Sequence, residues 1–152
     1  MDAQEMARAC ADAMWADDSA SRGLGMRIIS IEPGIAVLSM TVTDRMVNGH
    51  GLCHGGFIFT LADSAFAFAC NTHNARTVAQ QCAVTFVSSA HLGDELVARA
   101  TERHRAGRSG IYDVTVARTE GSVVAEFRGH SRTIKGELLP GVQLRGALGA
   151  KA

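Results

Sequence analysis

The residue types that could do chemistry gather in one part of the chain. A glycine-rich loop contains Asn48, His54, Gly55 and Gly56, and an apolar run that holds the acid Asp63 follows at once. A glycine-rich loop that leads into a helix presents unpaired backbone N–H groups at the positive end of that helix, where an acyl oxygen or a phosphate can be held. A carboxylate nearby can activate water. The loop and the acid together predict a site in which the loop polarises an acyl oxygen and the carboxylate activates water beside it.

Three residues of the same loop, His50, Cys53 and His54, are of the types that bind zinc. The glycines around them leave the backbone irregular, and no fourth ligand stands at a spacing typical of zinc sites. We therefore expect no metal. The four cysteines lie far apart and form no C-x-x-C pair: Cys10, Cys53, Cys70 and Cys82. Such spacing indicates free thiols in a reducing compartment.

Length and charge exclude several classes of protein. A chain of 152 residues is the size of a single domain. The 15 basic and 15 acidic residues cancel, which argues against wholesale binding to nucleic acid or to an anionic membrane. The first fifteen residues lack the apolar block of a signal peptide, and no run reaches the length of a membrane span. We expect a cytoplasmic protein.

The elements that must position the loop and the acid can be read from periodicity. An N-terminal helix is predicted over residues 2–17, and a second helix over about 56–72 is apolar almost all round, which is typical of a buried helix. Alternating polar and apolar residues, separated by turn signals, predict six strands: 25–32, 35–43, 77–88, 95–105, 110–119 and 122–134. Short turns predict that neighbouring strands pair antiparallel. The expected fold class is α+β, with one antiparallel sheet wrapped around the central helix.

Four segments of the chain carry a resemblance to a known family. They are 47–50 (Val-Asn-Gly-His), 53–56 (Cys-His-Gly-Gly), 61–67 (Leu-Ala-Asp-Ser-Ala-Phe-Ala) and 127–129 (Phe-Arg-Gly). The pattern resembles the hotdog-fold acyl-CoA thioesterases, and most closely the PaaI-type group that hydrolyses phenylacetyl-CoA and hydroxylated relatives. The resemblance runs from about Gly25 to Ile134. It implies a hotdog domain over residues 1–135, with five or six strands around one long helix. The glycine-rich tail, 136–152, is expected to be loosely ordered.

The resemblance also implies roles for individual residues. Asp63 is expected to be the catalytic carboxylate, as nucleophile or as general base, and the Gly55 N–H is expected to polarise the thioester carbonyl. Asn48 and His54 are expected to shape the loop. The family further implies a homotetramer, a dimer of dimers with active sites between subunits, and no cofactor. Gly56 and Ser64, which adjoin these residues, are further candidates for contact with the substrate.

Three more candidates come from other parts of the chain. Relatives carry an asparagine near the end of the first helix that helps to place water, and Asp17 stands at that position here. Arg103 and Arg108 lie on a predicted strand and in the turn that follows it, where they could bind the phosphates of coenzyme A. Arginines on a strand face can also simply keep an edge soluble.

The expected function is hydrolysis of acyl-CoA thioesters, with an aryl-acyl substrate such as phenylacetyl-CoA, as in phenylacetate degradation. A hotdog dehydratase or hydratase is an alternative, but such enzymes carry a histidine on the central helix, and His73 lies at its far end. A second alternative is a non-catalytic acyl-CoA-binding protein. The presence of the acid Asp63 argues against it.

Helix dimensions predict that two chains share each site. Gly55 and Asp63 are eight residues apart, which corresponds to about 12 Å along one helix axis. Catalysis needs the oxyanion donor and the attacking group each within about 3 Å of the reacting atoms. If both residues act on one carbonyl, they must come from different copies of the helix.

Overall fold

The computed structural model describes residues 1–146, and its elements follow the predicted order. The helices are α1 (Ala3–Asp17), α2 (Ser19–Gly23), the short 3-10 helix η1 (Asp44–Met46) and α3 (Gly55–Cys70). The strands are β1 (Arg27–Glu32), β2 (Ile35–Thr41), β3 (Thr77–Phe86), β4 (Glu95–Ala106), β5 (Ser109–Arg118) and β6 (Val123–Thr133). Every predicted strand and both predicted helices are confirmed to within two residues at each end, while α2 was not predicted.

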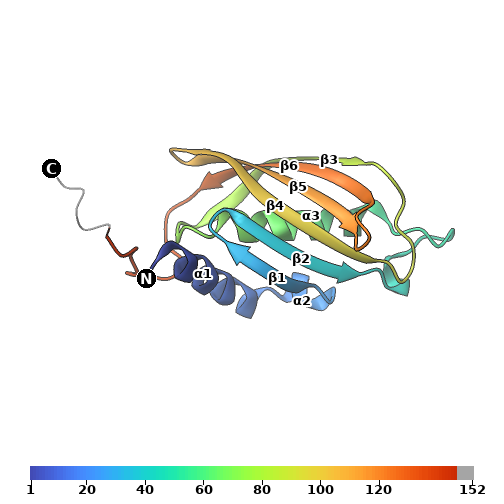
Figure 1. Ribbon diagram of the computed structural model, residues 1–152, viewed down its shortest axis with the longest axis horizontal. Coiled ribbons are helices and arrows are strands. Elements are labelled where there is room, and N and C mark those ends of the chain that lie inside the picture. Colours follow the sequence, from blue (N-terminus) through green and yellow to red (C-terminus); the bar gives the residue numbers. More distant parts are fainter. Residues whose placement is uncertain (147–152) are drawn as a thin grey trace.

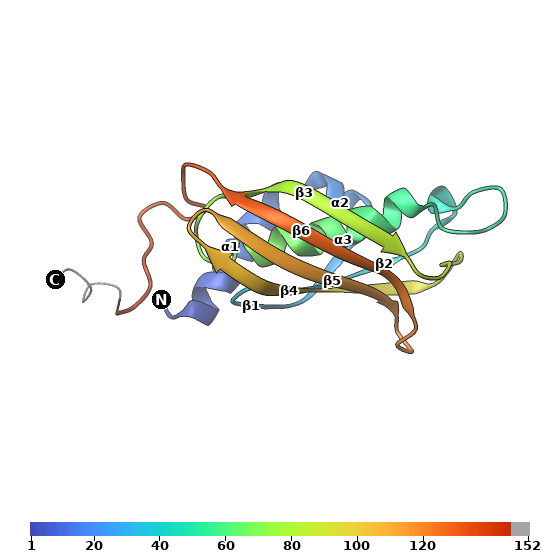
Figure 2. The same cartoon turned by 90° about the horizontal axis from the view of Figure 1, so that it is seen from above.

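The six strands form one antiparallel sheet in the order β1-β2-β4-β5-β6-β3 (Figures 1 and 2). The prediction that neighbours in sequence pair is wrong for β3 and β4, because β3 pairs with β6 and leaves its other edge open. The reason is the segment before β4. Its Gly93 N–H and Asp94 carbonyl exchange hydrogen bonds of 2.9 and 2.8 Å with Val42, and so β4 starts beside the end of β2.

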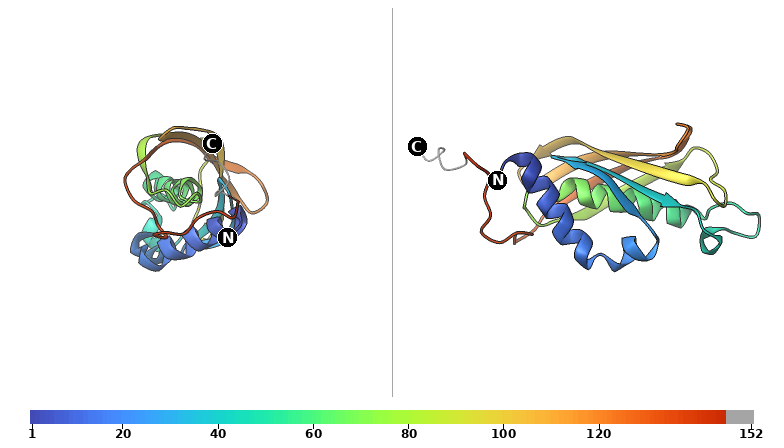
Figure 3. Two further views of the ribbon diagram at one scale, coloured as in Figure 1. Left: turned by 90° about the vertical axis from the view of Figure 1, so that its left-hand side faces the viewer. Right: turned by 60° about the horizontal axis from the view of Figure 1, so that its bottom comes forward.

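The sheet curls around α3, as Figure 3 shows in its left view. Eight α3 residues are buried against it: Ile58, Leu61, Ala62, Ala65, Phe66, Phe68, Ala69 and Cys70. Close approach of helix and sheet depends on Gly129 of β6, where a Cβ would lie only 2.7 Å from the Phe66 ring. The Phe66 ring also packs on Tyr112, with centroids 5.6 Å apart. The predicted wrapping of the sheet around the central helix is confirmed.

One side of α3 is not covered by its own chain. Along this side Gly56 is exposed, and Thr60, Asp63 and Ala67 are only half-buried. The prediction of a helix buried all round is therefore wrong for one isolated chain. The uncovered side borders β3, whose side chains are mostly exposed.

The N-terminal and C-terminal segments meet at the end of α3 (Figure 1). Helix α1 begins with a capping box between Asp2 and Glu5. The described part of the tail, 136–146, has no helix or strand, yet it is anchored. The Asn74 amide donates to the carbonyls of Leu139 and Val142 at 2.9 and 3.1 Å and accepts the Leu139 N–H at 2.7 Å. Residues 147–152, also predicted to be loose, lie outside the described residues.

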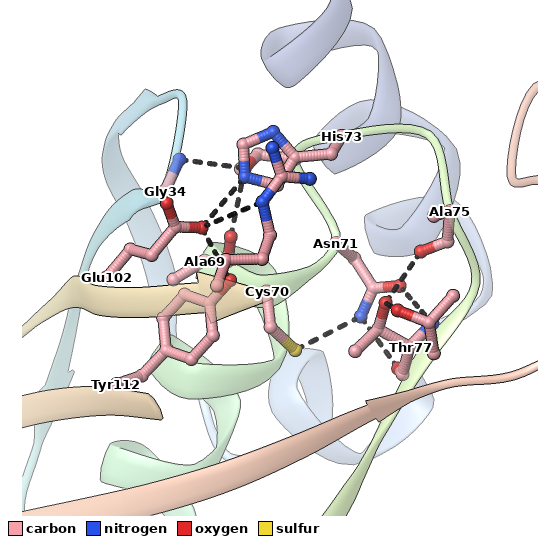
Figure 4. A network of polar contacts seen from close by, with 12 residues as sticks. Gly34, Ala69, Cys70, Asn71, His73, Ala75, Thr77, Glu102 and Tyr112 are labelled. Atoms are coloured by element: carbon pink, nitrogen blue, oxygen red, sulfur yellow. Dashed lines mark hydrogen bonds and ion pairs between the residues drawn. The ribbon is translucent and has the colours of Figure 1, made fainter. Parts of the chain in front are cut away.

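A polar network fastens the C-terminal end of α3 to the sheet (Figure 4). Glu102 Oε1 accepts a hydrogen bond from the Tyr112 hydroxyl at 2.7 Å and lies 2.9 Å from His73 Nε2. Burial opposes ionisation of Glu102, but these hydrogen bonds and the charges of His73 and Arg105 outweigh it, so the pKa of Glu102 is lowered. Sequence alone offered no partner for His73.

Replacing Glu102 by glutamine is expected to lower the free energy of unfolding at neutral pH by about 1–3 kcal/mol, since hydrogen bonds to charged groups are the stronger ones. The pKa of Glu102 is depressed in the folded state, so its stabilisation is present above the unfolded-state pKa and is lost as pH falls through the folded-state pKa. Urea unfolding across a pH series should show wild-type and Glu102→Gln curves that converge in acid. A difference that widens in acid would contradict this assignment.

No helix within residues 1–146 has both the length and the apolar character needed to cross a membrane.

Candidate active site

The loop before α3 is held by the side chain of Asn48. Its Oδ1 accepts the N–H groups of His50 and Leu52 at 2.9 and 3.3 Å, and its own N–H donates to the Leu52 carbonyl at 2.9 Å. Gly51, with φ of 74°, makes the turn between them. Asn48 thus holds the loop in its turn through its side chain.

His54 is the N-cap of α3. Its Nδ1 accepts the Gly56 N–H at 3.0 Å, and its backbone N–H donates to the Met46 carbonyl at 2.7 Å, which fixes where the helix starts. The Gly56 N–H, a predicted substrate contact, is therefore already used inside the chain. The Gly55 N–H has no acceptor within the described residues 1–146. It is left as a donor at the positive end of the helix.

A cavity of about 440 Å³ lies at this end of α3 and is lined by Gly55, Asn48, Ile58, Phe86 and their neighbours. A Cβ at Gly55 would lie 2.8 Å from the exposed Phe86 ring, so the ring would have to shift if residue 55 had a side chain. Ser88 and Ser89 also line the cavity. The cavity gives an oxygen access to the helix N-terminus.

Asp63 lies farther along α3, half-buried and next to β3. Its Oδ1 is 3.9 Å from the Cys82 sulfur. Burial raises the pKa of Asp63, and the hydrogen bond from the Cys82 thiol opposes that rise only in part. A carboxylate whose pKa is raised is a better proton acceptor near neutral pH than an ordinary one. Its environment therefore suits a general base.

Removing the Cys82 thiol should change the pH dependence of any reaction that uses the Asp63 carboxylate. In Cys82→Ala the pKa of Asp63 should rise further, because the donor that opposes the effect of burial is gone. The acid limb of the kcat/KM profile should then move to higher pH. Cys82→Ser, which keeps a donor, should stay near wild type. An acid limb that does not move in Cys82→Ala would separate Asp63 from the pH-dependent step.

The three polar side chains in the middle of α3, Thr60, Asp63 and Ser64, make different contacts. The Thr60 hydroxyl donates back to the Gly56 carbonyl at 2.8 Å. The Ser64 hydroxyl lies 2.8 Å from the hydroxyl of buried Ser21 in α2. The Asp63 carboxylate contacts Cys82 of β3. Ser64 therefore ties two helices together, and its hydroxyl is engaged inside the chain.

Helix α2 was missed by sequence reasoning, although its start carries a recognisable signal. Asp18 is the N-cap, and its carboxylate accepts both the N–H of Ser21 at 2.8 Å and its hydroxyl at 2.7 Å. Aspartate is a common N-cap residue because its carboxylate can accept the backbone N–H three residues later. Through Ser21 and Ser64, this cap supports the turn of α3 that carries Asp63.

The remaining candidates lie away from Gly55. Asp17 is exposed at the end of α1, where it lines a separate cavity with Asn71 and Thr77. Arg103 Nε is 3.5 Å from Asp113, a carboxylate that also binds Arg128 at 2.7 Å. Arg108 is exposed in the β4–β5 turn. The structure does not bring these three side chains to the N-terminus of α3 in the same chain.

The cysteines are free thiols in the described chain, as predicted. Burial raises the pKa of Cys70 to about 12, so this thiol is not a candidate nucleophile. Among residues 1–146, no three His, Cys, Asp or Glu side chains are grouped so that they could hold a metal ion.

Comparison with known proteins agrees with this geometry. The model of the thioesterase superfamily matches residues 50–125, which include the helix start and Asp63. The acyl-coenzyme A thioesterase PaaI of Escherichia coli strain K12 is 44% identical over 128 residues, 84% of this chain and 91% of that protein.

Solved structures show the same likeness. The E. coli PaaI protein from the phenylacetic acid degradation operon superposes with a TM-score of 0.87 at 42% identity, over 88% of this chain and 97% of that one. A Streptococcus mutans protein, smu.793, solved with bound acetyl-CoA, has a TM-score of 0.70 at 27% identity, over 74% of this chain and 90% of that one. The chain therefore belongs to the thioesterase superfamily and is a thioester hydrolase with the hotdog fold.

Proposed function

We propose that this protein hydrolyses acyl-CoA thioesters to the free acid and coenzyme A, and that its substrates are aryl-acyl thioesters such as phenylacetyl-CoA. The observation that carries the proposal is the Gly55 N–H, which has no acceptor among residues 1–146 and lies at a cavity, on the same helix as a half-buried carboxylate of raised pKa. The 44% identity to E. coli PaaI supports the substrate class. The zero net charge and the free thiols fit a cytoplasmic enzyme.

The residues suit a two-stage displacement. The Gly55 N–H donates a hydrogen bond to the thioester oxygen and stabilises its developing negative charge, since a fixed donor at a helix N-terminus costs no reorganisation. Asp63 either takes a proton from water as the oxygen of that water adds to the carbonyl carbon, or adds to the carbon itself and is then released by water. In both routes the C–S bond breaks and coenzyme A leaves as a thiolate, which recovers a proton. No strong acid is needed for this leaving group.

A second chain completes the site, and we place the interface between the two chains at β3. Gly55 packs against Phe86 and Asp63 against Cys82, so α3 and β3 run side by side past both residues. Eight helical residues span about 12 Å and four strand residues about 13 Å, so the two distances match. The outer edge of β3 is unpaired within the described chain.

Antiparallel pairing of two β3 edges around a twofold axis can bring Gly55 to the Asp63 of the partner. This requires Phe86 to lie opposite the partner's Cys82, which centres the axis on Val84. The uncovered side of α3 would then face the partner. Two such dimers would form the homotetramer that the family resemblance implies.

A cysteine at the twofold axis tests this register. Val84→Cys in a Cys82→Ala background should form a disulfide between chains under mild oxidation, because directly paired antiparallel residues have Cα atoms about 4.5–5.5 Å apart, within disulfide range. Non-reducing electrophoresis measures the linked dimer. A cysteine at Val78 in the same background, toward the other end of β3, should not link. Linking at Val78 but not at Val84 would rule out this register.

Release of free coenzyme A, followed with a thiol reagent, tests the reaction. Phenylacetyl-CoA, benzoyl-CoA and medium-chain acyl-CoAs should be turned over, with the aryl-acyl thioesters preferred. Binding without release would favour the acyl-CoA-binding alternative. Conversion of an enoyl-CoA would favour a hydratase, which α3 argues against: Gly55–Cys70 contains no histidine, and His73 beyond it is engaged by Glu102.

The nucleotide end of coenzyme A needs a cationic partner. Arg103 already shares Asp113 with Arg128, which weakens the case for it. Arg108 forms no ion pair within the described residues, and we keep it as the better candidate for a phosphate contact.

A further inference from the structure

A second cavity, of about 540 Å³, lies at the opposite end of α3 from Gly55. It is lined by residues of α1, by Asn71 and Thr77 where α3 and β3 meet, by Arg76, and by Leu138 of the C-terminal segment. The Asn71 amide donates to the Thr77 carbonyl at 3.0 Å and accepts its N–H at 2.9 Å, which closes this end of the helix against the strand (Figure 4).

The cavity continues the line on which the proposed chemistry lies. Three pairs of residues mark the course of α3 past β3: Gly55 with Phe86, Asp63 with Cys82, and Asn71 with Thr77. Asn71 follows Asp63 by eight residues, or about 12 Å of helix. A carbonyl held at Asp63 by the partner's Gly55 would therefore lie between the cavity at that Gly55 and the second cavity at Asn71. The cavity at Gly55 can take the coenzyme A arm, and the second cavity can take the far end of the acyl group.

Leu138 forms one wall of the second cavity. The segment that carries it is held by hydrogen bonds from residues between α3 and β3. Asn74 holds the segment with three side-chain hydrogen bonds to Leu139 and Val142. It is buried and has a left-handed backbone, with φ of 54°. The backbone of Arg76 adds bonds to Gly136 and Ile134 at 3.1 and 2.8 Å. The segment then curves round the end of α3 toward α1 (Figure 3, left), where the Arg145 N–H meets the Met1 carbonyl at 2.7 Å.

We propose that this anchored segment is a wall of the acyl-binding site, and that Leu138 limits the length of the acyl group that the enzyme accepts. The proposal rests on the assignment of Asp63 and Gly55 under the proposed function. Leu138, Met14 and Ala13 offer apolar surface to the end of an acyl chain, and Asn71 and Thr77 satisfy each other. The charged side chains of Asp17, Asp18 and Arg76 line the rest of the cavity. Because Asn71, which lines the same cavity as Leu138, lies about 12 Å along α3 from Asp63, we expect a phenylacetyl group to end short of this wall and a long acyl chain to reach it.

Two substitutions at Leu138 change the wall in opposite directions. Leu138→Ala should raise kcat/KM for dodecanoyl-CoA relative to phenylacetyl-CoA by at least about tenfold, since a single methylene of misfit is worth about 10–200-fold in a hydrophobic pocket. Leu138→Trp should lower the same ratio. Leu144→Trp is the matched control, because Leu144 lies on the same segment but is exposed and does not line the cavity. It should leave the ratio unchanged.

Release of the segment is a second, independent test. Asn74→Gly removes all three side-chain hydrogen bonds and still suits the positive φ, so the turn itself should survive. It should widen acceptance of long chains as Leu138→Ala does. Turnover of phenylacetyl-CoA, measured in parallel, reports folding and the central chemistry. The inference alone is overturned if the ratio of kcat/KM for dodecanoyl-CoA to that for phenylacetyl-CoA is unchanged in all three variants while phenylacetyl-CoA is still hydrolysed. If the wild type hydrolyses no acyl-CoA, the proposed function is overturned as well.

Discussion

Replacement of Asp63 by alanine or asparagine is expected to lower kcat by at least about a hundredfold while acyl-CoA still binds. The carboxylate is the only ionisable side chain on α3 that faces the open side of the helix, and burial has already raised its pKa. Asparagine has nearly the same shape but can neither take a proton at this pH nor attack a carbonyl. The loss should appear in kcat rather than in KM, as measured by release of coenzyme A.

Ser64→Ala is the matched control for the Asp63 variants. It removes a hydroxyl from the next residue of the same helix, but that hydroxyl bonds to Ser21 and not to the proposed site. It should lower thermal stability and leave kcat within a few-fold of wild type. Unchanged turnover in Asp63→Asn would show that the reaction does not depend on the Asp63 carboxylate. An equal loss in Ser64→Ala would mean that the loss in the Asp63 variants is not specific to the carboxylate.

Local features of the sequence predicted most of the fold. Strands such as β4 and β6 were located by alternation and by the glycine turns at Gly107 and Gly121, which adopt φ of 57° and 104°. The pairing of β3 with β6 could not be predicted, because it depends on where the segment before β4 is held. That segment is fixed by Val42, about fifty residues away in sequence.

The same division applies to the site. Loop and acid were found because both lie on one continuous stretch, whose glycines and single carboxylate stand out in an apolar context. Contacts that join distant segments were missed: Ser64 with Ser21, Asp63 with Cys82, and Asn74 with the C-terminal segment. Each depends on a side-chain hydrogen bond that only the folded arrangement creates.

The donor of the proposed oxyanion site can be deleted almost without altering the backbone. Gly55 is the first residue of α3, a position where proline is well tolerated because its missing N–H would have no helical acceptor. His54 already has φ of −62° and ψ of 132°, which suits a residue before proline. Gly55→Pro should therefore lose about 10²–10³-fold in kcat, as expected for one oxyanion donor. Gly55→Ala, which presents the same Cβ to Phe86 but keeps the N–H, is the control.

Two inactive variants should restore activity when their chains are mixed. In a dimer of one Asp63→Ala chain and one Gly55→Pro chain, one site combines both defects and the other combines the intact Asp63 with the intact Gly55. Random mixing makes half of the dimers hybrid, so about a quarter of wild-type activity should return, as symmetry of the twofold interface requires. Native mass spectrometry can verify that the chains have exchanged.

Hybrid activity separates a shared site from one built within a single chain. If one chain supplied both groups, every chain in the mixture would lack either its carboxylate or its N–H, and no amount of mixing would help. Recovery near a quarter requires that Gly55 and Asp63 act across the interface, as their separation of about 12 Å on one helix demands. Verified mixing without recovery would mean that one of the two groups does not touch the reacting carbonyl. Since Asp63→Asn tests the carboxylate independently, such a result would identify the Gly55 N–H as the group wrongly assigned.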